Sequence, residues 1–230
     1  PRLAALASVN LTYRVDFGGE RTIPMTPSGG RYSASIPSSA FRSDDMLRWF
    51  VSASDTDGNL GRAPVFLDRT GNNQSPEYFG TVVQNPSVTS QMPIFQWFTQ
   101  SESASNTRSG TRASVFFAEN FYDNIFVRKR GGATNGSSQK FDFNKGDSLY
   151  INEEMTSVGE INMNAQGSDS TYLRQSLAFE AYRAAGNAGC NSELWSMRIN
   201  GSFDRVGVFI EQVDGDFLSR NGYDPDSDLY

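Results

Sequence analysis

The first third of the chain alternates hydrophobic and polar residues, which is the pattern of half-buried β-strands. Hydrophobic side chains occupy every second position over residues 9–17, and polar side chains lie between them. The same alternation recurs over residues 32–36 and 47–53, with turns rich in Gly, Pro and Asp in between. Since successive side chains of a strand point to opposite faces, each segment is expected to bury one face.

Short strands separated by regular turns predict a small immunoglobulin-like β-sandwich over about residues 1–70. A stretch rich in Pro, Gly and Asn near residues 71–76 predicts a connecting segment. We therefore assign residues 1–90 to the sandwich with its connection, and residues 91–230 to a second domain. The clean alternation predicts that the sandwich folds independently of the second domain.

The second domain is predicted to be α+β, with strands, one helix and then a hairpin, so that the chain as a whole is predicted to be mainly β. One helix stands out because Asp169 offers an N-cap and Gly186 fits the position after the last turn. Between them, apolar residues recur at helical spacing and predict a core-facing stripe. This stripe consists of Leu173, Leu177, Ala181 and Ala184. Strands are expected at residues 95–98, 113–117, 124–129, 139–143, 160–164, 194–199 and 206–213.

Composition and charge exclude several functional classes. The 230 residues contain no histidine and a single cysteine, Cys190, which excludes histidine triads, intrachain disulfides and Cys/His metal clusters. Acidic turns at residues 55–59 and 224–228 lack the later ligands of a calcium loop, so no metal site is expected. A net charge of −6 disfavours a nucleic-acid partner, and no apolar run is long enough to span a membrane.

The one dense basic run lies at the end of a predicted strand. Arg128, Lys129 and Arg130 precede Gly131, and Lys140 follows a polar loop. Guanidinium groups and backbone N–H groups of such a loop can hold phosphate. The spacing is not that of a P-loop, and the alternative is an ordinary solvated group of charges.

Five segments of the second domain, taken together, resemble one protein family. Residues 198–203 read RINGSF, and residues 206–214 read VGVFIEQVD. Upstream, residues 169–174 read DSTYLR at the helix start, and residues 127–131 read VRKRG, followed by KFDF from Lys140. In this order the segments resemble the spore coat protein H (CotH) kinase-like family.

The resemblance implies the amino-terminal-lobe part of an atypical protein-kinase fold. Known members use ATP and Mg²⁺ to phosphorylate secreted or coat proteins, which implies an extracellular or cell-surface protein. By resemblance, four residues are nucleotide-binding. Arg130 marks the edge of the phosphate-facing loop, Lys140 pairs with phosphate, and Arg174 and Glu211 line or support the cleft. The alternative for each is an ordinary ion pair, and no catalytic residue is assigned within this chain.

Two departures from the family pattern leave enzymatic activity open. The family's Lys-Lys-Ser run corresponds here to Gly-Ser-Ser at residues 136–138, so Lys140 is displaced. The aspartates that orient the acceptor and bind Mg²⁺ lie, in the family, beyond the position of Tyr230. The chain therefore resembles a fragment, and we expect little or no binding of ATP by these residues alone. The alternative function is a non-catalytic structural or adhesion module in an extracellular layer or filament, which acts through a protein partner or self-assembly.

The predicted strand that contains Glu211 makes a geometric prediction. Alternation places Val206, Val208 and Ile210 on one side and Glu211 on the other. A carboxylate buried there needs a cationic partner, for which Arg174, Arg130 and Lys140 are the candidates. Leu173 is expected to enter the core while Arg174 reaches its rim. The alternative is a solvated Glu211 at the end of an edge strand.

Overall fold

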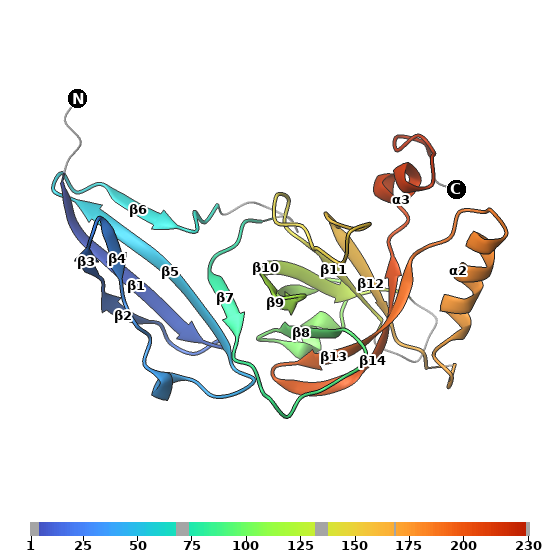
Figure 1. The fold of residues 1–230 in the computed structure, drawn as a ribbon, viewed down its shortest axis with the longest axis horizontal. Coiled ribbons are helices and arrows are strands. Elements are labelled where there is room, and N and C mark those ends of the chain that lie inside the picture. Colours follow the sequence, from blue (N-terminus) through green and yellow to red (C-terminus); the bar gives the residue numbers. More distant parts are fainter. Residues whose placement is uncertain (1–4, 68–73, 132–137, 168, 229–230) are drawn as a thin grey trace.

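The computed structural model describes residues 5–67, 74–131, 138–167 and 169–228. The molecule is mainly β and consists of an open sheet and a closed barrel, with the two longer helices near the carboxyl end of the described chain (Figure 1). The predicted mainly-β class is therefore confirmed. The predicted connection near residues 71–76 lies partly outside the described residues.

The first part of the chain forms one five-stranded sheet in the order β2-β1-β5-β6, in which β7 also pairs with β5. Its strands are β1 (Leu6–Val15), β2 (Arg21–Pro24), β5 (Met46–Asp55), β6 (Leu60–Ala63) and β7 (Phe79–Val82). A separate hairpin contains β3 (Thr26–Ser28) and β4 (Arg31–Ser33), and one 3₁₀ turn spans Ser38–Ala40.

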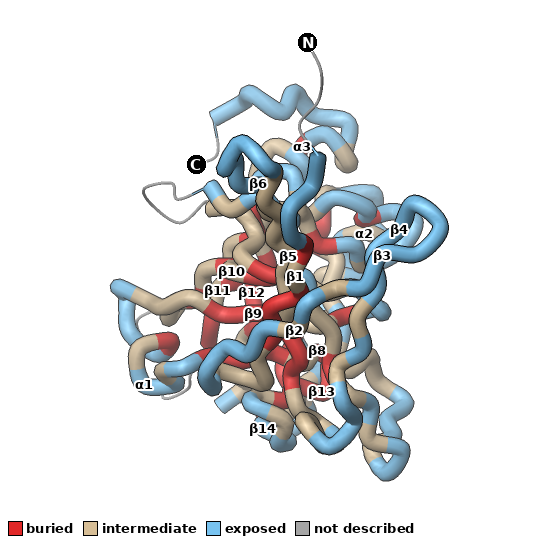
Figure 2. Tube along the Cα trace, turned by 90° about the vertical axis from the view of Figure 1, so that its left-hand side faces the viewer, coloured by how far each residue is buried: buried red, intermediate tan, exposed pale blue. Residues whose placement is uncertain are grey.

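The immunoglobulin-like sandwich is not confirmed, because the described residues show one sheet and a hairpin where a sandwich needs two packed sheets. The alternation itself is real, since Val9, Leu11 and Tyr13 of β1 are all buried. Alternation predicts that one face of a strand is covered but does not say by what. Figure 2 shows the β3–β4 hairpin exposed and many of the buried residues gathered in the barrel strands.

Seven strands of the second part close into a barrel in the order β10-β11-β12-β14-β13-β8-β9. Neighbours are antiparallel except for β13 and β8, which are parallel. All seven strands were expected from the sequence, but the closure was not. The strands are β8 (Ile94–Phe98), β9 (Thr111–Phe117), β10 (Asn120–Lys129), β11 (Gln139–Asp142), β12 (Glu160–Asn164), β13 (Ser192–Ile199) and β14 (Ser202–Glu211).

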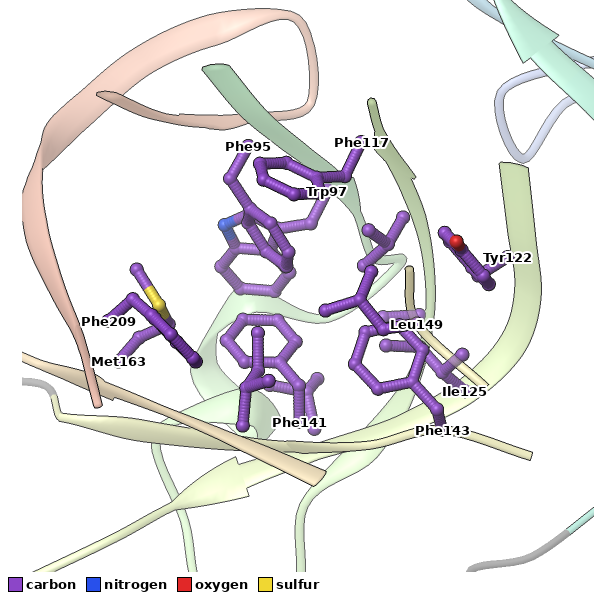
Figure 3. Packing of buried hydrophobic residues seen from close by; sticks show 14 of the residues in the cluster. Phe95, Trp97, Phe117, Tyr122, Ile125, Phe141, Phe143, Leu149, Met163 and Phe209 are labelled. Atoms are coloured by element: carbon purple, nitrogen blue, oxygen red, sulfur yellow. The ribbon is translucent and has the colours of Figure 1, made fainter. Parts of the chain in front are cut away.

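Aromatic rings fill the interior of the barrel (Figure 3). Phe95, Trp97 and Phe141 are fully buried, with ring centroids 5.1 Å apart for Phe95–Phe141 and 5.4 Å for Trp97–Phe141. Trp195 stacks on Phe209 at 4.6 Å. Since close-packed rings occupy this space, any ligand site has to lie on the outer face or at an end of the barrel.

The absence of a side chain at Gly207 is required by this packing. A Cβ atom at Gly207 would lie 2.5 Å from Met197 Sδ and 2.9 Å from Met163 Cε. We expect Gly207→Ala to lower the free energy of unfolding by about 1–3 kcal/mol through overpacking, as measured by urea denaturation. Gly61→Ala is the matched control, because a Cβ atom added at that position would meet nothing within 4 Å. Equal effects of the two substitutions would contradict this account.

Helix α2 (Arg174–Ala184) confirms the predicted helix, although its orientation differs from the prediction. Gly186 follows its end with a φ of +79°. The predicted N-cap Asp169 is not at the cap position, which Leu173 occupies, although the Asp169 carboxylate accepts a hydrogen bond from Arg174 N. The Leu-Ala stripe does not enter the core, because Leu173 is 44% and Leu177 is 56% exposed. Instead Tyr172 and Phe179 pack against a cluster on the outside of the barrel that includes Val208 and Ile210. Two shorter helices are α1 (Glu102–Ser105) and α3 (Gly215–Arg220).

The sheet and the barrel meet at a packed junction. Met46 and Val82 of the sheet are buried against Phe98 of the barrel. The Arg198 guanidinium pairs with Asp44 at 3.0 Å from across the junction. Such a contact favours coupled unfolding, whereas the sequence predicted independent folding of the first part. The domain boundary at residue 90 stays a prediction.

The buried carboxylate of Asp123 is the polar centre of the junction. Its oxygens accept hydrogen bonds from Ser114 Oγ at 2.7 Å, Tyr78 N at 2.9 Å and Glu77 N at 3.0 Å. Arg48 of the sheet completes the set with an ion pair of 3.4 Å, and its side chain is 7% exposed. Since Ser114 and Asp123 belong to the barrel and Arg48 to the sheet, the carboxylate joins the two parts.

A second carboxyl group beside Asp123 makes stability depend on pH. Burial, followed by the charge of Asp123, raises the pKa of Asp147 to about 6. Since this pKa lies above the value in an unfolded chain, the stability contributed by the neutral carboxyl is present near pH 4 and is lost as the pH rises through about 6. We expect Asp147→Asn to raise the free energy of unfolding by about 1–2 kcal/mol at pH 7.5 and to leave it almost unchanged at pH 4. Urea denaturation at both pH values tests this, with Asp57→Asn as the exposed control; a pH-independent effect would contradict it.

Candidate functional site

Two of the residues predicted to bind nucleotide, Arg130 and Lys140, lie on the outside of the barrel. Arg128 of β10, Lys140 of β11 and Asn162 of β12 are neighbours in register. The residues between them, such as Phe141 and Ile161, point into the core. The alternation of the strands thus separates an aromatic interior from an outer polar face. This outer polar face consists of Arg128, Arg130, Lys140, Asp142, Glu160, Asn162 and Asn164.

Carboxylates already engage two of the cations on the outer polar face. Arg128 pairs with Asp142 at 3.5 Å, and Lys140 pairs with both Glu160 and Asp142. Burial lowers the pKa of Lys140, while the charge of Asp142 acts in the opposite direction. Lys140 therefore takes part in an ion pair within the chain, which is the alternative that the sequence left open for each predicted site residue.

Two cavities, each of about 420 Å³, open on this side of the barrel and share Glu160. The basic cavity is lined by Arg128, Lys140, Asp142, Lys145 and Glu160, among others. The acidic cavity is lined by Glu154, Glu160, Glu211, Asp214, Asp216 and Arg220, among others. Lys140 and Glu211 therefore lie on either side of Glu160.

Arg130 differs from the other two basic residues of the outer polar face. Its Nη1 donates to Asn164 Oδ1 at 2.8 Å. In the part of the chain that the structure describes, no carboxylate lies within ion-pair distance of its guanidinium group. Burial lowers the pKa of Arg130, while a charge on Cys190 would act in the opposite direction. Arg130 is thus the predicted site residue that is best suited to receive an anion.

Glu211 is buried, as expected if it needs a cationic partner, but that partner is not one of the three predicted cations. Its side chain accepts hydrogen bonds from Asn191 N at 2.8 Å and from Arg220 Nε at 2.9 Å, and a second contact joins it to Arg220 Nη2. The edge-strand alternative is wrong because β14 lies between β12 and β13. Arg220 was missed, although a signal for it exists: Asp214 caps helix α3, and Arg220 lies in its last turn.

Arg174 does not join the other predicted site residues. Its side chain is 76% exposed and pairs with Asp169 at 3.5 Å, beside the start of α2. It is not among the residues that line the acidic cavity around Glu211. The prediction that Leu173 enters the core with Arg174 at its rim is wrong, since both side chains lie at the surface. The side of the helix that faces the barrel carries Phe179 instead.

The donor set on the outer polar face determines what it can hold. Arg130 fits one phosphate-class anion, whereas Lys140 and Arg128 are occupied by carboxylates. Among the described residues, no group of three or more His, Cys, Asp or Glu side chains is arranged to hold a metal ion. Residues 136 and 137 of the displaced Gly-Ser-Ser run lie outside the described residues, while the Ser138 carbonyl accepts from Arg130 N.

Comparison with known proteins supports the resemblance found in the sequence. Residues 127–230 match the family model described as CotH kinase protein. The matched region begins within β10 and includes β11, β12, α2, β13, β14 and α3. No curated protein matches the chain. None of the helices in the described part of the chain is long and apolar enough to cross a membrane.

Proposed function

We propose that this chain carries the nucleotide-facing, amino-terminal-lobe part of a CotH-type kinase-like domain, preceded by an accessory β-sheet. The whole protein would transfer phosphate from ATP to secreted or coat proteins outside the cell. ATP–Mg²⁺ would supply the phosphoryl group and neutralise its charge. Of the residues in this chain, Arg130 would contact phosphate, and Lys140 and Glu211 would shape the surrounding surface.

The observation that carries the proposal is the succession of elements along the matched region. Three consecutive strands, β10, β11 and β12, are neighbours in the sheet, and α2 follows before β13 and β14. Protein kinases place a glycine-rich loop at the phosphates, a lysine on the third strand and a glutamate on the following helix. In this chain the connection between β10 and β11 begins after Arg130 and Gly131, which supports our assignment of this connection to the phosphate-facing loop.

One observation favours the second candidate function, a non-catalytic structural or adhesion module. The third strand of the set, β12, reads EINMN and contains no lysine or arginine. Lys140 lies on the second strand and is held by Glu160. A module of this kind would keep the kinase-like fold and use its surface for a protein partner or self-assembly.

A phosphotransfer assay separates the two functions. The protein that contains this chain is incubated with γ-labelled ATP, Mg²⁺ and secreted or coat proteins as acceptors, and incorporated label is measured. We expect transfer, and Arg130→Gln should reduce it at least tenfold, whereas Arg128→Gln should not, because Asp142 already neutralises Arg128. Absence of both transfer and ATP binding by the protein would reject the proposal in favour of the structural module.

A further inference from the structure

The structure contains a hydrogen-bonded relay that links the end of β10 to helix α2. Arg130 Nη1 donates to Asn164 Oδ1 at 2.8 Å, and Asn164 Nδ2 donates to Gln175 Oε1 at 3.1 Å. Gln166 Nε2 donates to the same Gln175 oxygen at 3.1 Å. The relay therefore joins the three elements β10, β12 and α2 through side chains alone.

The donors and acceptors available on these side chains determine which group donates at each hydrogen bond of the relay. A guanidinium group has donors only, so the Asn164 atom that faces Arg130 has to be the amide oxygen. The other end of the Asn164 amide is then its NH₂ group, which needs an acceptor, and the Gln175 oxygen supplies it. Each member thus orients the next, and Arg130 is held without being neutralised.

We propose that Arg130 is the phosphate-binding cation of this site and that Asn164 and Gln175 are its positioning residues, so that a neutral amide pair joins strand β12 to helix α2 where protein kinases use an ion pair. The inference rests on the proposed function for the identity of the ligand, a phosphate group of a nucleotide.

The electrostatic balance of the outer polar face supports this assignment. A lysine paired with a helix glutamate serves phosphate in kinases, but Lys140 is committed to Glu160 and Asp142. An Asn–Gln pair adds no charge, so the positive charge of Arg130 stays available for an anion. A guanidinium can bind two phosphate oxygens at once.

The relay also attaches helix α2 to the barrel. No residue of α2 is buried, so few apolar contacts hold this helix on the barrel. Gln175 lies in its first turn, where the bond to Asn164 fastens the helix to β12. Binding of an anion at Arg130 and docking of the start of α2 should therefore stabilise each other.

Binding of inorganic pyrophosphate, followed by isothermal titration calorimetry on the full chain, tests the cation. We expect Arg130→Gln to weaken binding at least tenfold and Arg130→Lys to weaken it less, because lysine keeps the charge but loses the planar fork. Arg128→Gln is the control with the same charge change beside the same loop, and it should alter affinity less than twofold. Equal losses in Arg130→Gln and Arg128→Gln, or no loss in either, would overturn the assignment.

The positioning role needs a readout that a purely structural role would not change. Arginine Nε resonances in NMR spectra report whether a guanidinium is held or rotates freely. We expect Gln175→Met and Asn164→Leu to average the Arg130 signal and to weaken pyrophosphate binding about threefold or more, while the Arg128 signal stays unchanged. An unchanged Arg130 signal in both variants would contradict the relay.

The two proposals fail in different ways. Phosphotransfer that persists unchanged in Arg130→Gln would overturn the inference and leave the kinase function intact. Pyrophosphate binding that depends on Arg130, in a protein that transfers no phosphate, would reject the kinase function and support the anion site. If Arg130→Gln lowers the unfolding midpoint, the pyrophosphate affinity of Arg130→Lys is compared with that of the wild type instead.

Discussion

Asp123→Ala should lower the free energy of unfolding by about 3–5 kcal/mol, because it leaves the Arg48 guanidinium buried without its carboxylate. Three further donors lose their acceptor at the same time, namely Ser114 Oγ, Tyr78 N and Glu77 N. The loss should appear in urea denaturation as one transition of the sheet and the barrel together, since the carboxylate joins the two. The measurement uses tyrosine and tryptophan fluorescence together with far-UV circular dichroism.

The control for this prediction is an exposed pair in the same chain. Arg174→Met breaks the contact with Asp169, in which the arginine side chain is 76% exposed, and should cost less than about 1 kcal/mol. A double variant, Arg48→Met with Asp123→Leu, should recover part of the loss, because no unpaired charge stays buried. A small effect of Asp123→Ala, or separate transitions with unequal shifts, would show that the junction does not couple the two parts.

Arg220→Met should cost about 3 kcal/mol, because it leaves Glu211 charged and 7% exposed at the end of the barrel. Asn191 N would be the one backbone donor still satisfying this carboxylate among the described contacts. The methyl-thioether side chain keeps the packing volume near Phe217, so the measured loss reports the ion pair rather than a cavity.

Glu211→Gln and the double variant show how much of the loss in unfolding free energy comes from the unpaired charge of Glu211. Glu211→Gln keeps an acceptor for Arg220 and should cost less than Arg220→Met. Arg220→Met combined with Glu211→Gln should cost less than the sum of the single changes, because the partners are coupled. Additive losses measured by urea denaturation would mean that the two side chains stabilise the protein independently.

Local periodicity was sufficient to place most of the strands. Residues 160–164 were expected as a strand and form β12, and the strand expected over residues 47–53 lies within β5 (Met46–Asp55). The end of α2 followed from Gly186, because a residue without Cβ readily adopts the positive φ after a helix. These features depend on a few neighbouring residues, so the sequence carries them directly.

The candidate site was only partly predictable for the same reason. The sequence shows Arg130 and Lys140 at the two ends of one polar segment, and the structure places Lys140 opposite Arg128 in register. Their partners come from distant positions: Asn164 lies 34 residues from Arg130, and Gln175 reaches Asn164 from a helix. Glu211 was expected to need a cation, but which arginine reaches it depends on how α3 returns to the barrel end.

The sequence by itself determined the mainly β class, the individual strands, the single long helix and the resemblance of the second part to the CotH family, because periodicity, turn residues and ordered motifs are local properties. Only the tertiary structure decided that seven strands close into a barrel, that the first part is one sheet docked on it through Arg48 and Asp123, and that the Leu173 stripe of α2 faces solvent. These outcomes depend on which buried faces meet, and many pairings satisfy the same alternation.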